Sequence, residues 1–426
     1  MKILHIIPGS GGSFYCGNCL RDSKYVPALK ALGHEVVKLP MYLPLFANNQ
    51  EENDTPVFYG AVSIYLKQLY PVFRNAPEWV DKILNAKPML KLAAKYSGST
   101  NAKGLEEMTV SMLMGEDGQQ SEELERMVDW IAGHYKPDII HLSNALLLGL
   151  AFTIKRRLKT ILICSLQDED VWIDVMKPRF RNHIWSLMQK SVAYVDGFIA
   201  VSDYYAGQMK ERMLIPAEKL TSIHIGVDPS DYFPQPIENK KRTIGFISRM
   251  CADNGLDILV DAFIALKKRK GFADVTLVIT GGATGVDTNY INEIKASIRK
   301  HHLTEQVFFH DDFSAEGLTA FYEKVSVISV PVRNGEAFGI YLLESMASGV
   351  PVIQPSLGAF PEIIRISGGG VLYEPNEPAA LTQALADTLS NPALLQKLSL
   401  DGIKGVETAF DISTQAAKMV RYYEQF

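Results

Sequence analysis

The chain has 426 residues, with 43 Lys and Arg against 48 Asp and Glu, which is a formal net charge of −5 at pH 7. At about 150 residues per domain, this length predicts two or three domains. A hydrophobic content of 47% excludes a largely disordered chain. The mild acidity argues against a dedicated nucleic-acid binder, which would carry a basic face, so we expect no nucleic acid among the partners.

The cysteine content and the start of the chain indicate its compartment. Four cysteines in a chain of this length do not make a disulfide framework and indicate a reducing environment. The first apolar stretch is short and interrupted by His5, which is not typical of a signal peptide. No 18 apolar residues run together, as a membrane-spanning helix would require. These features predict a soluble, cytoplasmic protein.

Short apolar runs alternate with longer helical patterns along the chain. Many of the runs are rich in Ile and Val and bounded by turn residues, which is typical of buried parallel strands. Parallel strands need crossovers of about a dozen residues or more, and helices fill them here. The expected strands are residues 3–7, 36–39, 139–142, 160–166, 197–201, 243–248, 275–280, 307–310, 325–330 and 350–354.

The alternation is interrupted once, where three prolines and a glycine follow a strand-like segment. We place a linker there, over about residues 228–241. The expected fold class is therefore α/β, with two Rossmann-like, doubly wound parallel-sheet domains at residues 1–228 and 241–405. Ligands of such sheets bind at the carboxyl ends of the strands, so two domains face to face would place a cleft between those ends.

Residues 66–130 depart from the alternation and have a mostly helical, insertion-like pattern. Within residues 79–103, lysines alternate with large apolar side chains. One interpretation is solvated lysines on helices that pack on the core. The other is a basic amphipathic face that contacts anionic lipid or a lipid-linked acceptor, with the protein peripheral at the inner membrane face.

The strongest chemical signal lies between residues 331 and 353. A strand should end at Pro331, and a helix should begin near Gly339 or Ile340 and stop at Gly349, since glycine is a common helix stop. Glu344 then projects from near the second turn of this helix.

An anion site is expected at the start of the same helix. Glu336 stands just before the helix, and the backbone N–H groups of residues 338–341, among them that of Phe338, point into the space where the helix dipole favours a phosphate. Two carboxylates beside an anion site suit a nucleotide sugar. Glu344 would accept hydrogen bonds from ribose hydroxyls and Glu336 from the sugar.

With its flanking residues, this segment resembles the Glu-x7-Glu motif of the retaining glycosyltransferases of family 4, which have the GT-B architecture. The resemblance extends to residues 198–202, 226–234 and 358–363. It implies a nucleotide-diphosphate sugar as co-substrate and no other cofactor. It also implies that the second domain binds this donor, that the first binds a saccharide or lipid-linked acceptor, and that residues 406–426 form a helix that crosses back to the first domain.

Residues 244–257 resemble the family's strand–loop–helix, in which an Arg and a Lys five positions later grip the donor diphosphate. Arg249 matches, but Asn254 stands at the Lys position. Asn can donate a hydrogen bond but brings no charge to the leaving group, whose negative charge needs a fixed partner. Gly281 and Gly282 resemble the family's glycines near the nucleotide.

The first apolar run is followed by a glycine-rich loop that contains Gly11 and Gly12. Glycines let the backbone approach a ligand closely and leave N–H groups for anions, and the loop resembles the family's glycine loop near the donor phosphates. Cys16 and Cys19 follow in a Cys-x-x-Cys pattern. They are either small packing residues at a helix start, a redox pair or half of a zinc site.

At the end of the strand at residues 160–166, Gln167 stands where the family often has a His that faces the reacting sugar. Gln can hydrogen-bond a hydroxyl but cannot exchange protons. The acids that follow, Asp168, Glu169 and Asp170, either act on the acceptor or form an exposed turn. His141 lies within an expected strand and is interpreted as a core histidine with satisfied hydrogen bonds.

The resemblance favours a retaining, metal-independent glycosyltransferase with a glycan or glycolipid precursor as acceptor. No acidic metal-binding cluster accompanies the motif, so no metal is expected. The candidate catalytic residues are Glu336, Arg249, Gln167 and Asp168. Asn254 and Gln167 motivate an alternative, in which a related protein binds a sugar nucleotide or glycan without turnover as a scaffold or regulator. A third possibility is phosphorolysis or another sugar reaction on the same fold.

Overall fold

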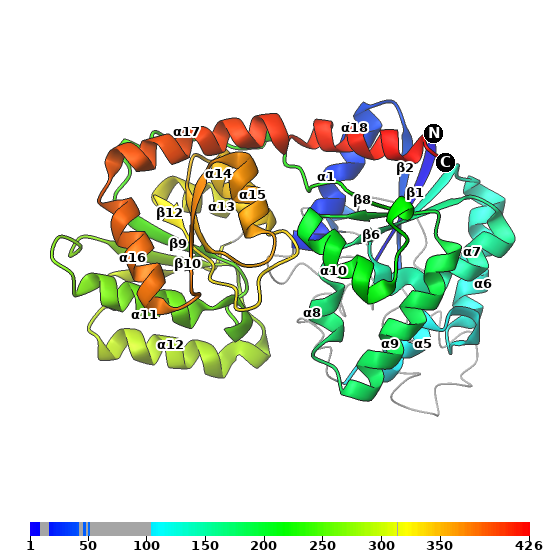
Figure 1. Cartoon of the computed structure of the whole chain (residues 1–426), viewed down its shortest axis with the longest axis horizontal. Helices are drawn as coiled ribbons and strands as arrows, with labels where there is room; N and C mark the ends of the chain where they lie inside the picture. Colours follow the sequence, from blue (N-terminus) through cyan, green and yellow to red (C-terminus); the bar gives the residue numbers. More distant parts are fainter. Residues whose placement is uncertain (9–16, 42–45, 48–49, 52–103, 313) are drawn as a thin grey trace. The chain divides into compact units, whose positions relative to one another are not determined.

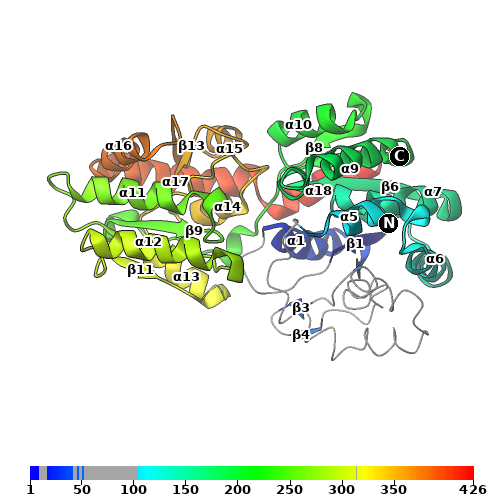
Figure 2. The same ribbon diagram turned by 90° about the horizontal axis from the view of Figure 1, so that it is seen from below.

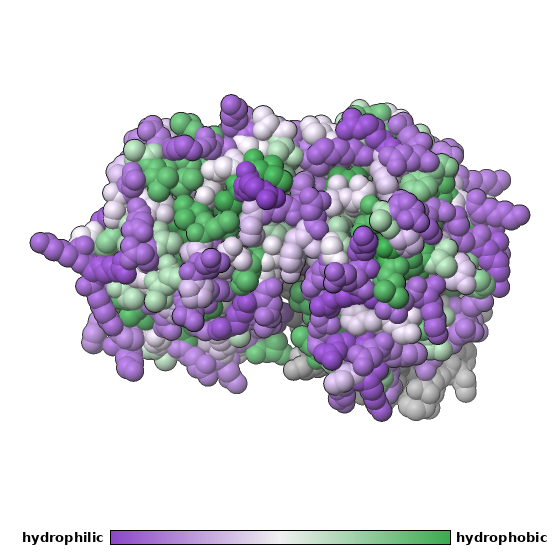
Figure 3. Space-filling view, in the orientation of Figure 1, coloured by the Kyte–Doolittle hydropathy of each residue, from purple (hydrophilic) through white to green (hydrophobic). Residues whose placement is uncertain are grey.

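A computed structural model of the chain describes residues 1–8, 17–41, 46–47, 50–51, 104–312 and 314–426. The chain divides into two compact units. The first contains the described residues of Met1–Ser13, Asn18–Ile223 and Ala416–Phe426, and the second contains His224–Gln415. Both are drawn in Figure 1. On the face drawn in Figure 3, each unit presents a largely hydrophilic surface with smaller apolar patches.

The first unit is built on a six-stranded sheet in the order β2-β1-β5-β6-β7-β8, and all its strand pairs are parallel. Its strands are β1 (Lys2–Ile7), β2 (Glu35–Pro40), β5 (Ile139–Leu142), β6 (Ile161–Leu166), β7 (Gly197–Ala200) and β8 (Leu220–Ser222). A separate short antiparallel pair joins β3 (Phe46–Ala47) and β4 (Gln50–Glu51). Its helices include α1 (Gly17–Ala31), α5 (Glu106–Leu113), α6 (Ser121–Trp130), α7 (Ala151–Leu158), α8 (Glu169–Ile173), α9 (Pro178–Ser191) and α10 (Asp203–Met213).

The second unit contains a six-stranded sheet in the order β11-β10-β9-β12-β13-β14, again parallel throughout. Its strands are β9 (Thr243–Ile247), β10 (Thr276–Thr280), β11 (Val307–Phe309), β12 (Val327–Ile328), β13 (Val352–Pro355) and β14 (Gly370–Tyr373). Its helices are α11 (Leu256–Lys267), α12 (Thr288–Lys300), α13 (Ala315–Lys324), α14 (Ile340–Ala347), α15 (Phe360–Ser367), α16 (Pro378–Leu389) and α17 (Pro392–Ala409).

Helices cover both faces of the second sheet. Helices α11 and α12 lie side by side on one face, as the view in Figure 2 shows, and α14 and α15 lie on the opposite face against α17 (Figure 1). Because both faces are covered, strands such as β9 and β13 are buried along their whole length. This is the physical reason for the continuous apolar runs in the sequence.

The expected α/β class with two Rossmann-like parallel sheets is confirmed, and each expected strand overlaps an observed one. Four observed strands lie outside the expected runs: the short pair β3 and β4, and the strands β8 and β14 of the two six-stranded sheets. β8 and β14 are edge strands with partly exposed residues. The sequence of β8 is mostly polar, and the apolar run of β14 covers only residues 371–373.

Val227, next to the expected linker, pairs with the segment between α17 and α18 (Ile412–Tyr423) within the second unit. Val227 N–H donates to Phe410 O at 3.0 Å, and Ile412 N–H donates to Val227 O at 2.9 Å. Helix α18 begins there, and its residues from Ala416 onward belong to the first unit.

Part of the insertion-like stretch is described. Residues 106–130 contain α5 and α6, whereas the lysine-rich residues 79–103 lie outside the described residues. In the part of the chain that the structure describes, no helix is long and apolar enough to span a membrane.

Candidate functional site

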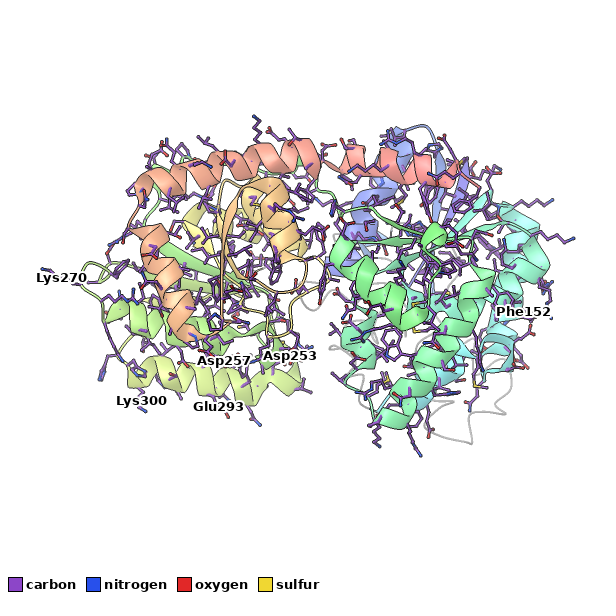
Figure 4. All side chains as sticks on the ribbon, viewed as in Figure 1. Phe152, Asp253, Asp257, Lys270, Glu293 and Lys300 are labelled. Atoms are coloured by element: carbon purple, nitrogen blue, oxygen red, sulfur yellow. The ribbon has the colours of Figure 1, made fainter. Side chains whose placement is uncertain are left out.

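Three loops of the second unit meet at the carboxyl ends of adjacent strands. They follow β9, β10 and β12, which are neighbours in the sheet. Ser248 N–H donates to Thr280 O at 3.2 Å and Met250 N–H to Gly282 O at 2.9 Å, which joins the first two loops. The third is tied to the first by a bond of 2.9 Å from the N–H of Arg333 to the carbonyl of Asp253, and Figure 4 labels Asp253 beside the start of α11.

Two glycines make the close approach of these loops possible. Gly281 has a φ of +115°, and a Cβ added to it would lie 2.3 Å from the carbonyl oxygen of Ser248. Gly255 has a φ of +69°, and its Cβ would lie 2.0 Å from the carbonyl oxygen of Pro331. Only glycine accommodates both the positive φ and the contact. Gly281 and Gly282 thus lie at the strand end expected from the sequence, packed against the loop of Arg249.

Arg249 lies in the first of these loops, with its guanidinium bound to an acid. Its Nε and Nη2 donate to the two carboxylate oxygens of Asp287 at 2.8 and 2.9 Å, and Nη2 also donates to Thr284 Oγ1 at 3.0 Å. Burial by itself lowers the pKa of Arg249, but the bond to Asp287 and its charge raise that pKa above its ordinary value. Arg249 is therefore a fixed cation at this edge of the sheet.

Asn254, which stands at the position of the family's Lys, turns its side chain back into the loop. Its Nδ2 donates to Ser248 Oγ at 2.8 Å and to the carbonyl oxygen of Arg249 at 2.9 Å. An Asn side chain has two donor hydrogens, and both are used by these contacts. The amide therefore stabilises the loop that carries Arg249.

Helix α14 begins after Gly339 and carries Glu344 on its second turn, as expected. All eight of its residues are buried, so the expected apolar face extends around the whole helix. The carboxylate of Glu344 is held at both oxygens: Tyr232 Oη donates to Oε1 and Tyr322 Oη to Oε2, each at 3.3 Å. The sequence interpretation did not include either tyrosine.

Glu336 and Gly339 stand just before Ile340, the first residue of α14, as the spacing suggested. A Cβ at Gly339 would lie 2.8 Å from Oε2 of Glu336, so the carboxylate lies directly beside the start of the helix. Tyr341 is buried in the first turn, and its hydroxyl has no hydrogen-bond partner among the described residues. Burial, and next the charge of Glu336, raise the pKa of Tyr341 well above its ordinary value.

Phe338 lies just before α14. Its ring is buried and packs against His224 and Phe410 with ring centroids 6.1 and 6.2 Å away. His224 in turn lies 2.6 Å from Oε1 of Glu362 through its Nε2. The aromatic cluster therefore anchors the peptide just before α14.

In the first unit, Gln167 lies at the carboxyl end of β6, as expected, but it is buried. Its Nε2 donates to the carbonyl of Ser143 at 2.9 Å, while Oε1 has no partner among the described residues. Asp168 has a φ of +56° and precedes α8. The exposed-turn interpretation is wrong for Glu169, which is fully buried. Hydrogen bonds from the neighbouring loops to its carboxylate offset the cost of burying this acid.

His141 is a core histidine with satisfied nitrogens, as interpreted from its place in a strand. Its Nδ1 lies 2.5 Å from Tyr423 Oη and its Nε2 lies 2.7 Å from Ser165 Oγ. Burial lowers the pKa of His141 well below its ordinary value, so the ring is neutral. This contact fixes the end of α18 in the first unit.

Some candidates cannot be placed. Gly11, Gly12 and Cys16 lie outside the described residues, and Cys19 lies in α1 with its side chain also outside them.

Sequence reasoning also missed Asp287, Thr284, Tyr232 and Tyr322. Their partners lie between 22 and 112 residues away, and no spacing rule predicts pairs at such separations.

The fold places the chain in the GT-B class. It is similar to sucrose-phosphate synthase from Thermosynechococcus elongatus, with a TM-score of 0.71 and 18% identity, over 100% of this chain and 98% of that one. It is also similar to Anabaena Alr3699/HepE in complex with UDP, with a TM-score of 0.69 and 17% identity over all of both chains.

Two family models together match residues 116–404, which include parts of both units. Residues 228–404 match "Glycosyl transferases group 1" and residues 116–231 match "Glycosyltransferase Family 4". The chain therefore belongs to the group 1 glycosyltransferases.

Curated relatives match part of the chain. The lipopolysaccharide core biosynthesis mannosyltransferase LpsB of Rhizobium meliloti is 27% identical over 47% of this chain and 53% of its own length. The phosphatidyl-myo-inositol mannosyltransferase of Mycobacterium leprae is 29% identical over 54% of this chain and 59% of its own. The chain thus spans about half the length of the curated relatives it matches.

Proposed function

We propose that the protein transfers a sugar from a nucleotide-diphosphate sugar to a hydroxyl of an acceptor, with retention of the anomeric configuration. The observation that carries the proposal is the pair of carboxylates at the start of α14: Glu336 lies against Gly339 just before the helix, and Glu344 lies on its second turn. The loop of Arg249 lies at the end of a neighbouring strand. Hydroxyl-binding acids beside a cation and free backbone N–H groups suit a nucleotide sugar.

Each group has a role in this reaction. Glu344, oriented by Tyr232 and Tyr322, would accept hydrogen bonds from the donor ribose, and Glu336 from the transferred sugar. The anomeric C–O bond to the diphosphate breaks, and a bond to the acceptor oxygen forms on the same face. The acceptor proton passes to the departing phosphate oxygen. Arg249 and the N–H groups at the start of α14 would stabilise the developing negative charge.

The names of related proteins guide the choice of substrates. Relatives include mannosyltransferases of lipopolysaccharide core and of phosphatidyl-myo-inositol, and a protein of similar fold is described with UDP and with UDP-glucose. We propose that the acceptor is a saccharide or a lipid-linked hydroxyl compound, and that the donor is the sole co-substrate. Gln167 and Asp168 are proposed to contact the reacting sugars from the first unit.

The test is an NMR titration of the purified protein with UDP-, GDP-, ADP- and TDP-sugars, in which the anomeric signals are followed overnight with and without EDTA. We expect selective binding of one donor and slow release of free sugar that EDTA does not stop. Binding of a donor without release or transfer would favour the scaffold or regulatory alternative. Absence of binding across the panel would contradict the proposal.

A further inference from the structure

We propose that Asp287, Thr284 and Asn254 are positioning residues that hold Arg249 in one orientation, and that Asn254 is not itself a ligand of the diphosphate. The inference rests on the proposed function for the identity of the bound group. It assigns a role to the Asn that replaces the family's Lys, and to an acid that the motif does not include.

The guanidinium is fixed by a closed set of hydrogen bonds. Arg249 binds both oxygens of Asp287, and such bidentate pairs fix the plane of the guanidinium as well as its position. Nη2 of Arg249 also donates to Thr284 Oγ1, which donates to Asp287 Oδ2 at 2.7 Å. The N–H of Thr284 donates to the same oxygen at 2.8 Å. Asp287 is buried, whereas the Arg249 side chain remains 28% exposed.

The main chain of Arg249 is held from the other side. Asn254 Nδ2 bonds its carbonyl oxygen and Ser248 Oγ, which closes the loop between β9 and α11. A lysine at position 254 has no planar amide group with which to make these two bonds, and its ammonium group would lie at the end of a flexible side chain. With Asn254 in place of the family's Lys, the site lacks a second, mobile cation, but the loop that carries Arg249 is more rigid.

This arrangement leaves one edge of the guanidinium for an anion. The bonds to Asp287 and Thr284 use Nε and Nη2, and within the described residues Nη1 donates no hydrogen bond. The paired charge of Asp287 also offsets that of Arg249. Diphosphate binding should then depend on the direction of the Nη1 hydrogens more than on net positive charge.

The first test is Asp287→Asn, with binding of inorganic pyrophosphate measured by calorimetry. If orientation matters most, the variant binds about tenfold more weakly, the usual scale for a lost charged hydrogen bond. If net charge matters most, it binds more tightly because a carboxylate has been removed, and that result would overturn the inference.

A matched control lies at the opposite end of the second sheet. Arg242 forms the same kind of pair with Asp274, in the loop of Lys270, which Figure 4 labels far from Asp253. Asp274→Asn should leave pyrophosphate binding unchanged. Should Asp287→Asn fail to fold, Thr284→Val removes one bond to Arg249 and should weaken binding about threefold; unchanged binding would count against the inference.

The second test is Asn254→Lys, which restores the family's cation. If Asn254 positions the loop, the variant loses both amide bonds, and we expect kcat to fall about tenfold with the KM for the acceptor unchanged. Tighter pyrophosphate binding with equal or faster turnover would overturn the inference. Because pyrophosphate binding is measured without a sugar, a wild-type protein that binds it but transfers no sugar would contradict the proposed function alone.

Discussion

Tyr205 donates its phenolic hydrogen to Oε2 of the buried Glu169 across 2.8 Å. The same carboxylate accepts the N–H of Ala145 and of Gln167, each at 2.8 Å, so one acid joins the loops that follow β5 and β6 to α10. This acid, not the exposed turn considered from the sequence, holds Gln167 in place.

Glu169 should make the stability of the protein depend on pH. Burial raises its pKa from 4.5 to about 7, although the hydrogen bonds from Ala145, Tyr205 and Gln167 oppose the shift. The folded state thus binds the proton more tightly than the unfolded state. The resulting stabilisation is complete below pH 4.5 and is lost as the pH rises through about 7. The shift corresponds to about 3 kcal/mol.

Urea unfolding of the wild type and of Glu169→Gln at several pH values checks this. The difference in the free energy of unfolding, wild type minus variant, should fall by about 3 kcal/mol between pH 4.5 and 8. Other groups with shifted pKa values, such as Asp22, occur in both proteins and cancel. If the free energies of unfolding of the two proteins change with pH in parallel, the raised pKa of Glu169 is contradicted.

Glu344→Gln should weaken donor binding through the ribose. A neutral amide accepts hydrogen bonds from the ribose hydroxyls less strongly than a carboxylate, so we expect the KM for the donor to rise about tenfold. A 2′,3′-dideoxyribose analogue of the donor should bind both proteins equally. Glu323→Gln, at an exposed position on α13, is the control. If Glu344→Gln weakens the binding of the donor and of its analogue equally, Glu344 does not bind the ribose hydroxyls.

Gly281→Ala should displace the loop of Arg249. A methyl group there meets the Ser248 carbonyl at 2.3 Å with φ at +115°, and we expect a loss of about 2–4 kcal/mol in the free energy of unfolding. Gly285→Ala is the matched control because nothing lies within 4 Å of its added Cβ. Equal stability of the two variants in denaturant unfolding would refute the close contact.

Tyr423→Phe should loosen the end of α18. It removes the hydroxyl bonded to the buried Nδ1 of His141, and an unpaired buried nitrogen costs about 1–3 kcal/mol. Tyr422→Phe removes a partly exposed bond to the Lys219 carbonyl, which water can replace, so its cost should be smaller. Thermal unfolding compares the two, and a larger loss for Tyr422→Phe would contradict this account.

Local chemistry explains how much of the fold was predictable. Parallel strands buried on both faces are continuous apolar runs, so β1, β5, β9 and β13 were evident from sequence. The strand β8 was not, because its sequence is mostly polar, and β14 was not, because its apolar run is only three residues long. The start of α14 could also be predicted from the sequence, since Gly339 and the spacing of Glu336 and Glu344 are local features.

The amino-acid sequence by itself determined the two parallel-sheet units, the spacing of Glu336 and Glu344 around the start of α14, and the presence of Asn254 at the family's lysine position. Only the tertiary structure decided that Asp287 holds Arg249 and that Tyr322 holds Glu344. Hydrophobic periodicity and helix signals act over a few residues, whereas these hydrogen bonds form only when the fold brings distant loops and helices together: two loops for Asp287 and Arg249, and the helices α13 and α14 for Tyr322 and Glu344.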